Sequence, residues 1–100
     1  MWQCSDFEAV EGGEFDLQGE AGSVSMRLHE VKLLQRTEVE ESFSLLFTAP
    51  SADLGQGTYL VRQAELGALE LFLVPVGPCA DEPSMMAYES VFNIRLDQPG

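Results

Sequence analysis

Basic residues are scarce in this 100-residue sequence. Five lysines and arginines stand against seventeen aspartates and glutamates, so the formal net charge at pH 7 is −12. The first twenty-six residues contain six acids and no base. Such a surface repels phosphate backbones and anionic lipid headgroups, which argues against nucleic acid or a membrane as a partner. The commonest role of a surface charge of one sign is solubility.

Long apolar runs are absent as well. No segment approaches the roughly 20 apolar residues that a membrane-spanning helix needs. Residues 1–8 carry acids where a signal peptide has bases, and they lack its apolar region. The two cysteines, Cys4 and Cys79, have no metal-binding or framework spacing. We therefore expect a cytoplasmic protein whose cysteines are free thiols and not a Cys4–Cys79 disulfide.

Residues that could carry chemistry are few. His29 is the only histidine, so a Ser/His/Asp or Cys/His arrangement would have to be built on it. A zinc site would need more histidines or paired cysteines, and the acids do not follow the spacing of a calcium loop. Gly55-Gln56-Gly57 lacks the Lys-Ser/Thr of a phosphate-binding loop. The sequence therefore predicts no catalytic residue, no metal site and no cofactor.

The remaining sequence patterns are those of a β-protein. An apolar fraction of 45% suits one core and hence a single β domain over residues 1–100. Apolar alternation and turn residues predict an all-β, mainly antiparallel fold. We expect a small barrel or sandwich of about six strands, with one short N-terminal helical segment. The strands should lie near residues 15–17, 24–36, 43–47, 58–63, 69–74 and 86–96.

The N-terminal helical segment is expected over residues 5–11. Ser5 suits the N-cap position, and Glu8 stands three residues later, where it would complete a capping box. Gly12-Gly13 should end the segment.

Residues 24–36 admit two interpretations. The apolar residues change parity between Leu28 and Val31, so a strand here needs a bulge near His29-Glu30. A helix is the alternative, because Val24, Leu28 and Val31 fall at i, i+4 and i+7. The bent strand is favoured, since the rest of the chain is β.

Residues 69–74 are apolar on both faces for most of their length, which predicts a central strand covered on both sides, or a strand in the wall of a closed barrel. Pro75 has no N–H and should lie where the strand ends or bulges. On this basis Phe72→Ala and Phe92→Ala are each expected to cost about 3–5 kcal/mol. The predicted core comprises Phe15, Leu17, Met26, Leu28, Phe43, Leu45, Phe47, Leu60, Leu71, Leu73, Phe92 and Ile94.

Several short motifs resemble a known family. They are Gly57-Thr58-Tyr59, Leu66-Gly67, the run from Leu71 to Pro78, Tyr88-Glu89 and Val91-Phe92-Asn93. Together they are similar to a family of small uncharacterised bacterial proteins about 100 residues long, a domain of unknown function. Some members are encoded beside proteins similar to phage tail-collar proteins, which implies an accessory role in a tail-like or surface particle. The resemblance implies no catalytic residues.

The leading hypothesis for function is a non-enzymatic structural or protein-interaction module. A small-ligand-binding β-barrel is the alternative, and a hydrolytic or isomerase-type enzyme using two carboxylates comes third. In the segment 38–48, only one parity can face the core, so Leu46 should point outward beyond the acidic end at Glu40. Phe7 and Trp2 are the expected cover. An incomplete cover predicts weak self-association, or contact with a larger assembly component, weakened by Leu46→Glu.

Overall fold

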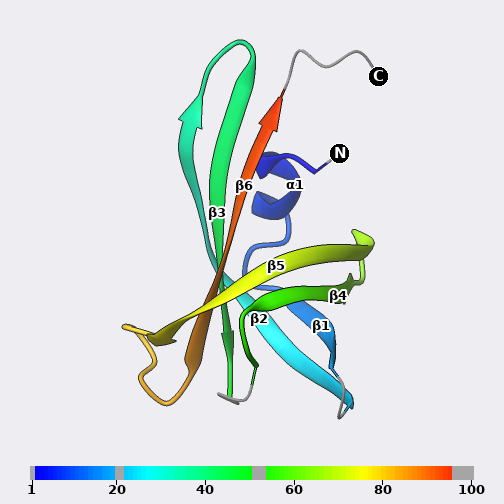
Figure 1. The fold of residues 1–100 in the computed structure, drawn as a ribbon, viewed down its shortest axis with the longest axis vertical. Helices are drawn as coiled ribbons and strands as arrows, with labels where there is room; N and C mark the ends of the chain where they lie inside the picture. The colour runs from blue at the N-terminus through cyan, green and yellow to red at the C-terminus, as the bar shows by residue number, and fades with distance from the viewer. Residues whose placement is uncertain (1, 20–21, 51–53, 96–100) are drawn as a thin grey trace.

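The computed structural model describes residues 2–19, 22–50 and 54–95. Its six strands are antiparallel and close into a barrel in the order β1-β2-β3-β6-β5-β4 (Figure 1). This confirms the predicted small all-β fold with a short N-terminal helix. The elements are α1 (Cys4–Glu8), β1 (Glu14–Gly19), β2 (Gly22–Arg36), β3 (Glu40–Ala49), β4 (Gly57–Gln63), β5 (Gly67–Pro78) and β6 (Met86–Arg95).

Helix α1 begins one residue earlier than predicted and ends at Glu8. Its N-cap is Gln3, whose backbone N–H donates to the Asp6 carboxylate at 2.8 Å. An acid three residues after the N-cap both accepts this bond and favours the positive end of the helix, so Asp6 fixes the start. The assignment of Ser5 and Glu8 to the capping box was therefore wrong.

Strand β2 is the bent strand that the parity change predicted. The pairing with β3 shifts between Leu28 and Glu30, which leaves His29 as the extra residue of a bulge. As a result, Leu28 and Val31 both face the interior despite their opposite parity. A second shift at Leu34 was not predicted.

Strand β5 lies in the wall of the closed barrel between β4 and β6, which confirms one of the two alternatives for residues 69–74. It is buried on one face only, so the other alternative, a strand covered on both sides, is wrong. Leu69, Leu71 and Leu73 are buried, but Phe72 between them is 50% exposed. The wall of a single-layer barrel has one inner face, and the side chain of Phe72 lies on the outer face. The expected position of Pro75 is confirmed, because the pairing with β6 shifts between Pro75 and Gly77.

The predicted core is largely correct, and its errors lie in β4 and β6. Leu60 is 41% exposed, because Tyr59 and Val61 are the residues of β4 that face the interior. Phe92 and Ile94 are only half-buried. The other nine predicted core residues are buried, namely Phe15, Leu17, Met26, Leu28, Phe43, Leu45, Phe47, Leu71 and Leu73.

Three strands continue past the barrel. Strand β1 pairs with β2 only as far as Arg27, and β5 pairs with β6 only as far as Glu89. Beyond these points β2, β3 and β6 form a three-stranded sheet, which rises above the level of β5 in Figure 1. We call residues 30–46 and 90–95 the three-stranded extension. Helix α1 contacts β2 and β3 there.

Candidate functional site

The interior of the barrel is filled by side chains. Phe15 and Phe47 meet edge to face at 5.1 Å, and leucines and valine from every wall strand except β6 surround them. A barrel of six strands encloses little more than its own side chains, so an internal ligand cavity is not favoured.

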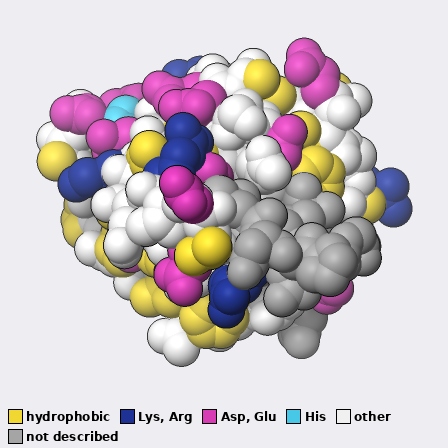
Figure 2. Space-filling view, turned by 90° about the horizontal axis from the view of Figure 1, so that it is seen from above, with side chains coloured by type: hydrophobic (Ala, Val, Ile, Leu, Met, Phe, Trp, Pro, Cys, Tyr) yellow, Lys and Arg dark blue, Asp and Glu magenta, His cyan; other side chains and the backbone are white. Residues whose placement is uncertain are grey.

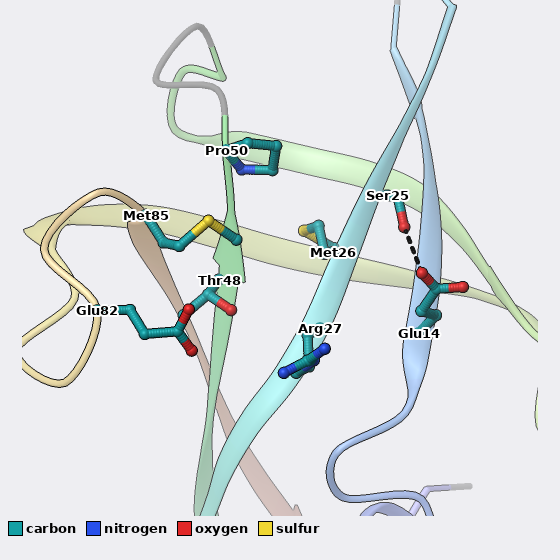
Figure 3. Close-up of a pocket in the computed structure, with 8 residues that line it drawn as sticks. All are labelled: Glu14, Ser25, Met26, Arg27, Thr48, Pro50, Glu82 and Met85. Carbon is teal, nitrogen blue, oxygen red and sulfur yellow. Dashed lines mark hydrogen bonds between the residues drawn. The ribbon is translucent and has the colours of Figure 1, made fainter.

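One pocket lies against the outer face of the wall. Its volume is about 260 Å³, below the range of about 300–1,000 Å³ typical of small-molecule sites. Figure 3 shows Glu14, Arg27 and Glu82 around it, with the Ser25 hydroxyl donating to Glu14 at 3.3 Å. A small pocket with both signs of charge indicates no particular ligand class. The remaining lining residues are Met26, Thr48, Pro50 and Met85.

One edge of the extension is formed by β6. Strand β6 pairs with β3 without a shift from Met86 to Arg95. On its other side, no strand in the described part of the chain pairs with residues 90–94. An unpaired edge presents backbone N–H and C=O groups that can bind another strand. The opposite edge of the extension, in β2, is interrupted by the bulge at Leu34.

The extension differs from the rest of the molecule in charge. It holds three of the five bases and four of the seventeen acids. Four large apolar side chains are exposed on it: Leu33, Leu34, Val39 and Val91. Figure 2 looks onto this end of the molecule and shows hydrophobic, basic and acidic side chains interspersed. The extension is therefore nearly neutral in net charge, although charged residues are no rarer in it than in the rest of the chain.

Helix α1 is attached to the extension through a buried carboxylate. Glu41 is 3% exposed; its Oε1 accepts the backbone N–H of Cys4 at 2.7 Å, and its Oε2 accepts the Nε–H of Arg36 at 2.9 Å. Burial raises the pKa of the Cys4 thiol, and the carboxylates of Glu8 and Glu41 raise it further. Cys4 is therefore a poor nucleophile near neutral pH.

The residues predicted to form an interface are divided between the surface and the core. Strand β3 lies between β2 and β6, so the segment that carries Leu46 is not an edge. Leu46 is half-buried on the outer face, and Glu40 is exposed. Phe7 is fully buried on the inner face, and half-buried Trp2 packs against it at 6.1 Å between ring centroids. The N-terminal segment thus covers the inside of the extension and not Leu46.

A cluster of three side chains was missed in the sequence. His29 Nε2 lies 2.7 Å from Asp81 Oδ2, and Cys79 Sγ lies 3.9 Å from the same nitrogen. About fifty residues separate His29 from the other two, so no local spacing could reveal the cluster. The only signal was that a single histidine would have to serve any such site. Both Cys79 and Cys4 are free and buried.

Comparison with known proteins gives one match. A family described as Domain of unknown function (DUF6916) matches residues 2–92. No curated protein and no solved structure matches the chain. In the described ranges, no helix is both long enough and apolar enough to cross a membrane. The match confirms the domain of unknown function to which the motifs pointed, while bacterial origin and tail-collar neighbours stay predictions.

Proposed function

Since the chain belongs to this family of unknown function, we propose a function from its own geometry: a non-enzymatic interaction module that binds an extended segment of another protein along β6. The observation that carries this proposal is the edge at residues 91–94, which pairs with no strand of the described part of the chain and continues a regular sheet. An added strand would gain main-chain hydrogen bonds there, as in other complexes formed by β-augmentation.

Side chains on both faces of this edge suit an added strand. Phe92 and Ile94 face inward and are only half-buried, so an apolar residue of the partner would complete their cover. Val91 faces outward and is exposed next to Ser44, its neighbour in β3. Alternating residues of the partner would meet these two rows in turn. We therefore expect the bound segment to have apolar residues at every second position.

Charge favours a different protein over a second copy of this chain. Thirteen of the seventeen acids lie outside the extension, and two copies placed side by side would bring these like charges together. A basic partner would be attracted by the same negative field, and a neutral partner would avoid the repulsion. The weak self-association predicted from the sequence is the alternative that the cross-linking experiment described below distinguishes from binding to a different protein.

The wider setting follows as part of the same proposal. The two buried free thiols suit a reducing compartment, which supports the cytoplasm. A small barrel with one unpaired strand edge would serve as an accessory component of a larger assembly, such as a tail-like or surface particle.

Site-specific photo-crosslinking tests the proposal. A photoreactive residue replaces Val91 on the open-edge strand, and the matched control replaces Leu60, an exposed apolar residue on β4, which has strands on both sides. We expect Val91 to cross-link to one extended segment and Leu60 to give none. The synthesised segment should then slow hydrogen exchange at those amides of residues 91–94 that point to the unpaired edge and not to β3. Equal cross-linking at Val91 and Leu60, or unchanged hydrogen exchange, would contradict the proposal. Cross-linking of Val91 to a second copy of this chain would show that the edge mediates self-association and does not bind a different protein.

A further inference from the structure

We propose that His29, Cys79 and Asp81 form a binding site for a transition-metal ion of the zinc class. The nitrogen, sulfur and oxygen donor atoms of these residues lie within 4.8 Å of one another. The site is independent of the β6 edge and needs no partner protein.

The fold holds the three donors in place from two elements. His29 is the extra residue of the first β2 bulge, which turns its side chain out of the regular alternation of the strand. Cys79 follows the last residue of β5, and its backbone N–H donates to the carbonyl of Met85 at 2.8 Å. This bond closes the loop that carries Asp81, two residues beyond the cysteine. A bulge and a closed loop are features that recur at functional sites.

The distances are close to those of a metal site. Tetrahedral bonds of about 2.0 Å to nitrogen and 2.3 Å to sulfur place these two ligand atoms about 3.5 Å apart. The Cys79 Sγ to His29 Nε2 distance is 3.9 Å, which is a few tenths of an ångström longer. The 2.7 Å between His29 Nε2 and Asp81 Oδ2 is a hydrogen bond, which an ion would replace by moving the carboxylate outward. The Asp81 side chain is 75% exposed, so it is free to move.

The donor set selects the kind of metal. Calcium and magnesium prefer oxygen ligands only, whereas a thiolate with an imidazole suits zinc and its neighbours. Three protein ligands leave one coordination position for water or a further ligand. Cys79 is buried, and the His29 side chain is 21% exposed, so the ion would enter from the side of Asp81. The net charge of −12 attracts cations to the surface.

The same geometry disfavours a Cys–His nucleophile. In such a pair the carboxylate orients one ring nitrogen while the other nitrogen takes the proton of the thiol. Here Asp81 and Cys79 both approach Nε2, so the two roles compete for one atom. Convergence of all donors on one point is what a metal ion requires.

Cobalt and zinc titrations test the site. The reduced full-length chain is titrated with Co²⁺, and a thiolate-to-cobalt charge-transfer band is expected in the near ultraviolet. Zn²⁺ should abolish the band by displacing cobalt, and competition with a chromophoric chelator gives the zinc affinity. Cys79→Ser should remove the band, and Asp81→Asn and His29→Gln should each weaken zinc binding at least about 100-fold.

Matched controls separate this site from unspecific binding. Cys4→Ser removes the other buried thiol, and Glu82→Gln removes the acid next to Asp81; neither should change the affinity by more than a few-fold. If Cys79→Ser fails to fold, Asp81→Asn decides, because its side chain is exposed and thermal unfolding will show it intact. Absence of the thiolate-to-cobalt band, or equal zinc affinity of the Asp81→Asn and Glu82→Gln variants, would overturn the proposal. Any zinc binding would then be unspecific binding by the acidic surface.

Discussion

Replacing Phe7 by alanine is expected to lower the free energy of unfolding by about 3–5 kcal/mol. Its ring is fully buried and packs against two stacked aromatic residues of the extension, with centroids 5.7 Å from Phe43 and 5.4 Å from Phe92. Each such pair contributes about 0.5–1.5 kcal/mol beyond burial. A domain of this size has only about 5–15 kcal/mol of stability in all. Urea unfolding followed by far-UV circular dichroism measures the change.

Phe72→Ala is the matched control, because it removes the same kind of side chain from an exposed position and not from a buried one. Phe72 is half-exposed on the outer face of β5. We expect a loss below about 1 kcal/mol, in contrast to the large loss that the sequence pattern predicted. A loss equal to that of Phe7→Ala would mean that the outer face of β5 is covered.

Replacing Glu41 by alanine is expected to cost about 2–4 kcal/mol, the second largest effect. The substitution removes the acceptor of two hydrogen bonds and leaves the N–H of Cys4 buried without a partner. Hydrogen bonds to a charged group are stronger than neutral ones. Loss of the hydrogen bond to Arg36 contributes less to this cost, because the Arg36 side chain is 51% exposed and water can replace the carboxylate. The control is Glu40→Ala, an exposed neighbour, which should stay within about 0.5 kcal/mol of the original protein.

The Glu41 variant should also loosen α1 before the barrel unfolds. Trp2 is the only tryptophan, and it packs against Phe7 of the helix, so its fluorescence reports the docking of α1. In Glu41→Ala the fluorescence should change at a lower urea concentration than the circular dichroism of the sheet. Coincident transitions, or equal losses for Glu40→Ala and Glu41→Ala, would show that the carboxylate does not hold the helix.

Local patterns predicted the parts of the fold that depend on which face of a strand is buried. The parity change around His29 located the bulge because inward apolar residues had to stay inward on both sides of it. Phe72 misled the prediction, since an apolar residue on an outer face looks the same in sequence whether or not something covers it. The prediction that Leu60 belongs to the core was wrong for a related reason. Leu60 and its neighbours Tyr59 and Val61 are all apolar, so their pattern does not show which face of the strand is buried.

Features that depend on the order of strands in the sheet could not be predicted. The sequence does not show that β3 lies between β2 and β6, so it could not tell whether the strand around Leu46 is an edge. The His29, Cys79 and Asp81 cluster arises because the bulge of β2 and the loop that follows β5 come close in space. Glu41 carried no signal either, since an acid inside an acidic run is usually solvated.

The closure of the ring sets an order of folding. Four neighbouring strand pairs are hairpins, which form within about 1–10 μs in isolation. The β1–β4 pairing joins distant parts of the chain through three residue pairs, whereas β3–β6 has ten. Loop-closure entropy and few contacts make the β1–β4 junction the last to form and the first to open. Native-state hydrogen exchange should be faster at residues 16–18 and 60–62 than in β3. Local opening of the barrel is thus expected at the β1–β4 junction.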